Sequence, residues 1–158
     1  MTGEIQVGKS FIISRVIAEL GLCPSGFKTI GMGDEVRIFA ADGSVPSENN
    51  LVALRKSAEK KGFPEVFDSV GTALLNQPGK PVLMDELGFF EKDAALFQQA
   101  VFSVIDSDTP VLGVIKPKHT PFLDRVRNHP KTQVIEITRE NREDMYPVVL
   151  ELVKKTLF

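Results

Sequence analysis

The sequence predicts an α/β domain with a mainly parallel sheet, because apolar runs of strand length alternate along the chain with amphipathic segments of helix length. Residues 81–84 and 109–115 are continuous apolar runs, as expected of parallel strands that are covered on both faces. Helix-like segments follow them at residues 96–105 and 121–128. A chain of 158 residues has the usual length of one domain and can bury a sizeable core, so we expect a single domain over residues 1–158.

The first half of the chain is predicted to form helices and a β-hairpin. Residues 11–20 are apolar on most sides, which predicts a buried helix. Residues 27–30 and 35–40 have strand character on either side of a Gly-Met-Gly-Asp turn, which is the pattern of a hairpin. Helix-favouring residues over 51–62 predict a short charged helix, and residues 64–76 predict another.

The end of the chain continues the alternation of strands and helices. Residues 131–138 predict the last strand, and residues 144–158 predict an amphipathic closing helix. In open α/β sheets, ligands bind outside the carboxyl ends of the strands. We therefore expect the functional groups of this protein to gather at that edge of the sheet.

The most informative motif lies at the start of the chain. Eight residues match the phosphate-binding loop G-x-x-x-x-G-K-[ST], and they are Gly3, Glu4, Ile5, Gln6, Val7, Gly8, Lys9 and Ser10. The glycines let backbone N–H groups approach phosphate oxygens closely, and Lys9 supplies a positive charge for the β- and γ-phosphates. Ser10 offers a hydroxyl to Mg²⁺, and together with Phe11 it opens a helix whose N-terminus favours anions. We expect residues 3–11 to bind a nucleoside triphosphate and Mg²⁺.

The position of this loop in the chain is unusual. A phosphate-binding loop normally follows a buried strand, whereas only Met1 and Thr2 precede it here. The sequence therefore predicts that the first strand of the sheet is absent or truncated at the N-terminus, or that another segment fills its place.

A second motif, Asp85-Glu86, ends the apolar run at residues 81–84. A carboxylate at this strand end can hold Mg²⁺ directly or through water, which is the role we expect of Asp85. The next residue along, Glu86, can reach past the γ-phosphate and orient or deprotonate a water molecule. An acidic pair that merely ends a strand in solvent is the alternative. The complete phosphate-binding loop upstream favours the first interpretation.

The run from Met84 to Glu91 resembles the D-E-I-G-x-M-E segment of the THEP-type nucleoside-triphosphatases. Residues 24–29 are similar to the segment that opens an inserted β-hairpin in that family, and residues 138–142 are similar to its C-terminal T-x-x-N-R motif. The resemblance covers nearly the whole chain. It implies the three-layer fold of P-loop NTPases with an inserted β-hairpin, and hydrolysis of nucleoside triphosphates with broad tolerance of the base.

The resemblance also implies two further site residues. Glu91 matches the second Glu of the family segment and would support the site, unless it only stabilises the first turn of a helix. Arg142 matches the Arg of the C-terminal motif and would contact phosphate or base, unless it is an ordinary surface residue.

The sequence departs from the family pattern in several places. Phe90 stands where the family has Met. The family segment that opens the hairpin usually continues into a Glu, with an Arg and a Gly-Phe later in the hairpin, whereas Ile30 and Gly31 follow here and only Arg37 is kept. The predicted strand at 109–115 ends in an atypical Lys-Pro-Lys run, in which Lys116 and Lys118 either attract phosphate or form a solvated loop. These changes leave phosphate binding intact and bear on substrate range and turnover.

Composition excludes several classes of function. The net charge of −2 provides no global basic field for nucleic acid or anionic membranes. No apolar run approaches the length of a membrane span, and no secretory signal is visible. The single cysteine, Cys23, cannot form an internal disulfide and suits a reducing compartment, so we expect a cytoplasmic protein.

Three functions remain open from the sequence. The first is a Mg²⁺-dependent and slow nucleoside-triphosphatase, which the adjacent Asp85 and Glu86 favour. The second is a nucleotide-binding regulatory or accessory protein with weak hydrolysis. The third is a small-molecule kinase, although the arginines form no cluster of the kind that a kinase lid needs.

Overall fold

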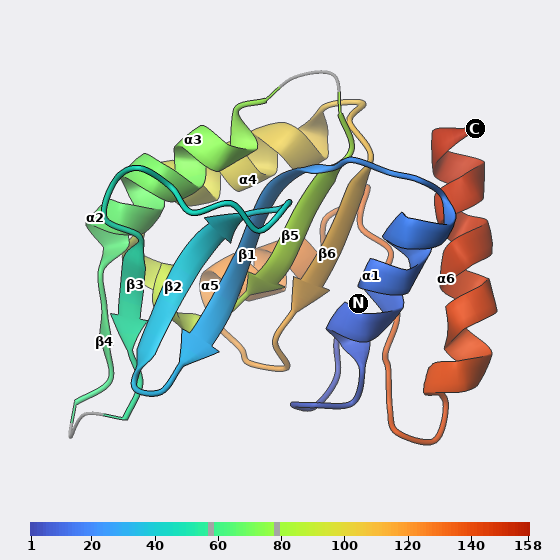
Figure 1. The fold of residues 1–158 in the computed structure, drawn as a ribbon, viewed down its shortest axis with the longest axis horizontal. Helices are drawn as coiled ribbons and strands as arrows, with labels where there is room; N and C mark the ends of the chain where they lie inside the picture. The colour runs from blue at the N-terminus through green and yellow to red at the C-terminus, as the bar shows by residue number, and fades with distance from the viewer. Residues whose placement is uncertain (57–58, 78–79) are drawn as a thin grey trace.

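The described residues form a six-stranded sheet with the strand order β4-β3-β2-β1-β5-β6 (Figure 1). The structure, a computed structural model, describes residues 1–56, 59–77 and 80–158. The strands are β1 (Ser25–Met32), β2 (Glu35–Ala40), β3 (Leu51–Leu54), β4 (Lys61–Gly62), β5 (Val82–Leu87) and β6 (Val111–Ile115). The helices are α1 (Lys9–Glu19), α2 (Pro64–Val66), the π-helical turn η1 (Phe67–Gly71), α3 (Thr72–Leu75), the 3₁₀ turn η2 (Phe89–Asp93), α4 (Ala95–Asp106), α5 (Pro121–Arg127) and α6 (Arg142–Leu157).

The sheet is mixed, so the prediction of a mainly parallel sheet is only partly confirmed. β5 pairs in parallel with β1 on one side and with β6 on the other. β1 and β2 form the predicted antiparallel hairpin, and β3 and β4 extend it in antiparallel order. The connections in this half of the sheet are too short to carry the crossover that a parallel pair requires, so each strand turns straight back.

Helices cover both faces of the sheet at β5 and β6, which gives the predicted three layers (Figure 1). Alternate residues of β5 point to opposite faces. Val82 and Met84 join the larger core with residues of α3, α4 and α5, whereas Leu83 joins a smaller core with Ile13 of α1 and Val153 of α6. This double burial explains why the run is continuously apolar rather than alternating.

Phe97 of α4 lies at the centre of the larger core and is completely buried. Its ring centroid lies 5.4 Å from that of Phe27 and 5.2 Å from that of Phe67. Gly71 lets η1 pack closely against the Phe97 ring, because a Cβ atom on Gly71 would lie 2.8 Å from two carbons of that ring. The helix predicted over 64–76 is confirmed as the continuous run of α2, η1 and α3.

The helix predicted over 51–62 is wrong, because this segment contains the strands β3 and β4. Residues 57 and 58 lie outside the described part of the chain. Val52 and Ala53 are completely buried, and β3 pairs with the hairpin strand β2. Burial against a preformed edge outweighs helix propensities that differ by at most about 0.7 kcal/mol per residue.

The strand predicted over 131–138 is also wrong in its extent. In the described part of the chain this segment makes a single bridge, between Thr2 and Glu136. The Thr2 N–H donates to the Ile135 carbonyl, and the Ile137 N–H donates to the Thr2 carbonyl, both at 2.9 Å. Within the described residues the segment therefore follows Thr2 closely but forms no ladder with it.

Met1 is hydrogen-bonded to the edge strand β6, on the other side from the segment 131–138 that Thr2 contacts. The Ile115 N–H donates to the Met1 carbonyl at 2.8 Å, and the Met1 amino group donates to the Gly113 carbonyl at 2.6 Å. Met1 and Thr2 therefore lie where the first strand was expected.

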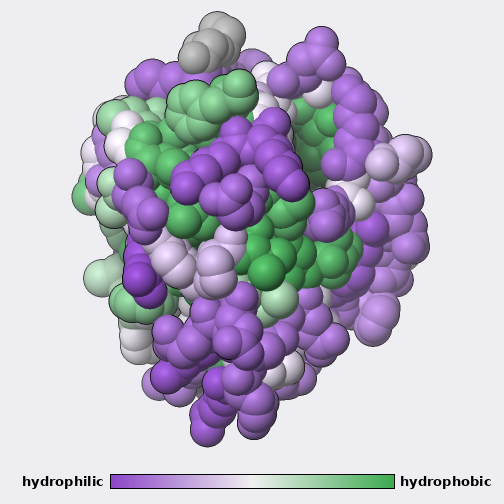
Figure 2. All heavy atoms as spheres, turned by 90° about the vertical axis from the view of Figure 1, so that its right-hand side faces the viewer, coloured by the Kyte–Doolittle hydropathy of each residue, from purple (hydrophilic) through white to green (hydrophobic). Residues whose placement is uncertain are grey.

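Met1 also lines a cavity of about 510 Å³. On the side of the molecule that carries α6, hydrophobic side chains reach the surface between hydrophilic ones (Figure 2).

The closing helix is confirmed as α6 and is amphipathic. Val149 and Leu150 are buried in a further core, which they share with Val16 of α1. On the exposed side of the helix, Glu151 and Lys154 form an ion pair at 3.1 Å. Among the residues that the structure describes, no helix is both long and apolar enough to cross a membrane.

Candidate active site

The backbone of the phosphate-binding loop takes conformations that only particular residues permit. Gly3 and Gly8 have φ angles of 143° and 107°, and Gln6 has a φ angle of 62°. A Cβ atom on Gly3 would lie 2.1 Å from the Ile137 carbonyl oxygen, so glycine is required there by both space and conformation. The loop therefore packs tightly against the segment that follows α5, and Gly8 forms the N-cap of α1.

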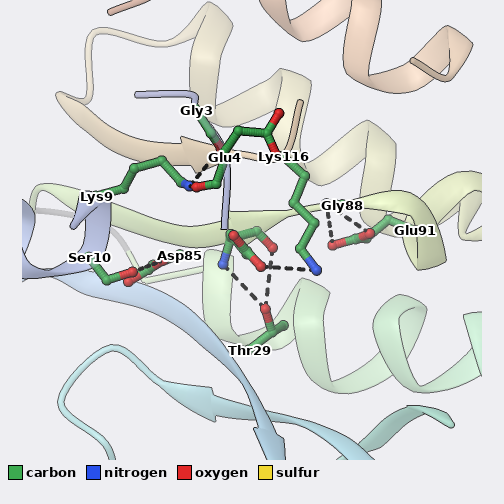
Figure 3. Close-up of polar contacts among 10 residues, drawn as sticks. Gly3, Glu4, Lys9, Ser10, Thr29, Asp85, Gly88, Glu91 and Lys116 are labelled. Atoms are coloured by element: carbon green, nitrogen blue, oxygen red, sulfur yellow. Dashed lines mark hydrogen bonds and ion pairs between the residues drawn. The ribbon is translucent and has the colours of Figure 1, made fainter. Parts of the chain in front are cut away.

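Lys9 lies inside this loop and is buried. Its ammonium group donates to the Gly3 carbonyl at 2.7 Å and to the Glu4 carbonyl at 2.5 Å (Figure 3). Burial lowers the pKa of Lys9, while the carboxylates of Glu86 and Asp85 act in the opposite direction. The loop thus surrounds a partly desolvated cation, which is an arrangement that attracts an anion.

Ser10 and Asp85 meet although they lie 75 residues apart in sequence. The Ser10 hydroxyl, in the first turn of α1, donates to the Asp85 carboxylate at 3.0 Å (Figure 3). Burial raises the pKa of Asp85, and the hydrogen bond from Ser10 partly opposes that effect. A hydroxyl and a carboxylate are hard oxygen donors of the kind that Mg²⁺ prefers, so this pair fits the predicted metal site.

Glu86 follows Asp85 through a cis peptide bond, and its carboxylate forms an ion pair with Lys116 at 3.1 Å. Its backbone is held by Thr29 of β1: the Glu86 N–H donates to the Thr29 hydroxyl at 3.3 Å, and that hydroxyl contacts the Glu86 carbonyl at 3.4 Å. Sequence reasoning assigned no role to Thr29. The parallel pairing of β1 with β5, visible only in the fold, brings it to the site.

Glu91 lies in the turn η2, directly behind the end of β5, and is 2% exposed. Both of its carboxylate oxygens accept from the Gly88 N–H at 3.1 Å. Burial raises the pKa of Glu91 to about 7, partly opposed by backbone hydrogen bonds and the charge of Lys116. Glu91 thus contacts the segment that leaves the site, and its supporting role stays a prediction.

The remaining predicted residues lie within the loop, in the first turn of α1 and at the start of α6. Ile5 and Phe11 are strongly exposed, whereas Val7 is buried in the core with α1 and α6. Arg142 is the first residue of α6. Its side chain lies beside the loop, since a Cβ atom on Gly8 would be 3.5 Å from the Arg142 Cδ atom. The structure therefore places Arg142 next to the loop, and its contact with phosphate or base stays a prediction.

The fold and the site together define a nucleotide-binding protein of the phosphate-loop class. A buried lysine inside the loop, a serine that opens the following helix and an aspartate at the end of a neighbouring strand are the parts that this class uses to bind phosphate and metal.

The chain belongs to the NTPase family, whose sequence pattern matches residues 1–150. It is 24% identical over 170 residues to the nucleoside-triphosphatase THEP1 of Natranaerobius thermophilus, an alignment that covers 99% of this chain and 96% of the relative. It is also 33% identical over 84 residues to the human cancer-related nucleoside-triphosphatase, which covers 50% of this chain and 44% of that protein. The predicted family is thereby confirmed, and with it the class of enzyme.

The crystal structure of THEP1 from Aquifex aeolicus has the same fold. The TM-score is 0.78 at 22% identity, and the match covers 97% of this chain and 96% of the other. This agreement confirms the predicted P-loop NTPase fold.

Proposed function

We propose that this chain hydrolyses nucleoside triphosphates to diphosphate and phosphate with Mg²⁺, at the site formed by the phosphate-binding loop and the end of β5. The observation that carries the proposal is the 3.0 Å contact between the Ser10 hydroxyl and the Asp85 carboxylate beside the buried Lys9. The nucleoside-triphosphatase names of the relatives support the same reaction.

Ser10 and Asp85 would hold Mg²⁺. When bound, the ion neutralises charge on the phosphate oxygens and so favours the transfer. The pKa of Asp85 is raised by burial, and a bound cation favours the ionised form of this carboxyl.

Lys9 stabilises the phosphates. Its ammonium donates to the carbonyls of Gly3 and Glu4, which are neutral acceptors. A phosphate oxygen is a charged acceptor and forms the stronger hydrogen bond, so binding of nucleotide exchanges these contacts for better ones. The charge that develops on the transferring group is then met by a cation already in position.

Glu86 is the general base for the attacking water. The water oxygen bonds to the γ-phosphorus while the bond from that phosphorus to the bridging oxygen breaks, and the water proton passes to the Glu86 carboxylate. We further propose that Glu91 supports this segment through Gly88 and that Arg142 contacts phosphate or base, in line with its place beside Gly8.

Phosphate release from ATP, GTP, CTP and UTP in the presence of Mg²⁺ tests the proposal, with Lys9→Ala as the blank. Release well above the blank is expected, with each base accepted to some degree. Release at the level of the blank would refute hydrolysis and leave the regulatory or kinase functions. Nucleotide binding equal in the wild type and in Lys9→Ala would refute the phosphate-loop assignment itself.

A further inference from the structure

The ion pair between Lys116 and Glu86 sits in the centre of the proposed site. The two charged atoms lie 3.1 Å apart, and the side chains are 36% and 27% exposed. In this state Lys116 pairs with Oε1 of the carboxylate that would accept the proton of the attacking water. The positive charge beside Glu86 makes this carboxylate a weaker base for as long as the pair is formed.

The backbone of Lys116 is held by hydrogen bonds, and its side chain is partly exposed. Its N–H donates to the Leu87 carbonyl at 2.9 Å, and its carbonyl accepts from the Arg127 guanidinium, which also pairs with Asp124 at 2.9 Å. The aliphatic part of the side chain passes close to Gly88, where a Cβ atom would lie 3.3 Å from the Lys116 Cδ. The backbone at Lys116 is thus held by hydrogen bonds on both its N–H and its carbonyl, whereas the partly exposed ammonium is held by the ion pair with Glu86.

Lys116 and the loop lysine Lys9 both lie close enough to Glu86 to interact with its charge. Lys116 lowers the pKa of Lys9, while Glu86 raises it, so both ammonium groups lie within electrostatic reach of one carboxylate. Figure 3 shows Lys116 extending toward the space between the loop and the end of β5. A γ-phosphate that enters this space brings negative charge toward both cations.

We infer that Lys116 is a cation for the γ-phosphate: it pairs with Glu86 when no nucleotide is bound and passes to the γ-phosphate when a triphosphate binds. The inference rests on the proposed hydrolytic function and adds a role to it. Binding of the substrate thereby releases the Glu86 carboxylate for the water and supplies charge stabilisation to the transition state. A diphosphate has no γ-phosphate and leaves the ion pair intact, so Lys116 distinguishes substrate from product.

The test compares affinities for the β,γ-imido analogue of ATP and for ADP by calorimetry with Mg²⁺, in the wild type and in Lys116→Met. We expect the variant to bind the analogue about 10-fold more weakly, the effect of one lost charged contact, and to bind ADP within about twofold of the wild type. Its kcat should fall about 10²-fold, the scale of a lost electrostatic donor. Lys116→Arg should keep the preference for the triphosphate analogue.

Lys118→Met is the matched control, because it removes the same charge from an exposed residue two positions along. It should leave both affinities unchanged, and thermal unfolding should show that all variants are folded. Equal weakening for analogue and ADP, no weakening for either, or the same loss in Lys118→Met would overturn the role of Lys116. Wild-type protein that binds the analogue but releases no phosphate from ATP would refute hydrolysis alone, since the affinity comparison would still decide on Lys116.

Discussion

Replacement of Glu91 by Gln should make the protein less sensitive to alkaline pH. Glu91 is buried, and burial raises its pKa from 4.5 to about 7. The folded protein therefore binds a proton on this carboxyl that the unfolded chain has already released at the same pH. Stability from this group is present below pH 4.5 and is lost as the pH rises toward 7.

The size of the effect follows from the two pKa values. Between pH 5 and pH 8, a group that titrates at 4.5 in the unfolded chain and about 7 in the folded protein loses about 2.5 kcal/mol of stability. Gln cannot ionise, and its amide oxygen can still accept the hydrogen bond from the Gly88 N–H. The wild type should therefore lose about 2.5 kcal/mol relative to Glu91→Gln over this interval.

Urea unfolding of both proteins at pH 5 and pH 8 measures this difference directly. Other titrating groups are common to the two chains and cancel in the comparison. Parallel pH dependence in the wild type and Glu91→Gln would refute the reasoning, because it would mean that Glu91 is ionised throughout. A steeper loss in the variant would contradict the sign.

Three further changes probe the site and the core. Glu86→Gln should keep nucleotide affinity but lower turnover about 10²-fold, as measured by binding and phosphate release, and equal turnover would remove Glu86 from the reaction. Gly3→Ala places a methyl group 2.1 Å from the Ile137 carbonyl oxygen at a φ of 143°, so it should lower both the melting temperature and nucleotide affinity; unchanged values would contradict the described loop. Phe97→Ala should lower the free energy of unfolding by about 3–5 kcal/mol in urea, and a loss below about 1 kcal/mol would mean that Phe97 is not a central core residue.

The loop and the acidic pair were recognisable because each is local. The phosphate-binding loop depends on residues that are consecutive in sequence, and Asp85-Glu86 follows directly on its strand. The helix of residues 64–76 and the hairpin were predicted for the same reason, because turn residues and periodicity are properties of short segments. The strands β3 and β4 were missed because their stability comes from pairing with β2, which propensities over 51–62 do not contain.

The sequence alone determined the class of chemistry: a phosphate-binding loop, a carboxylate pair at a strand end and the family resemblance are all visible in the order of residues. Tertiary structure alone decided how these parts act together. It brought Ser10 to within 3.0 Å of Asp85, placed Thr29 on the backbone of Glu86, and paired Lys116 with the Glu86 carboxylate. Parallel strands align residues that are far apart in sequence at one edge of the sheet, and the resulting distances and desolvation exist only in the folded chain.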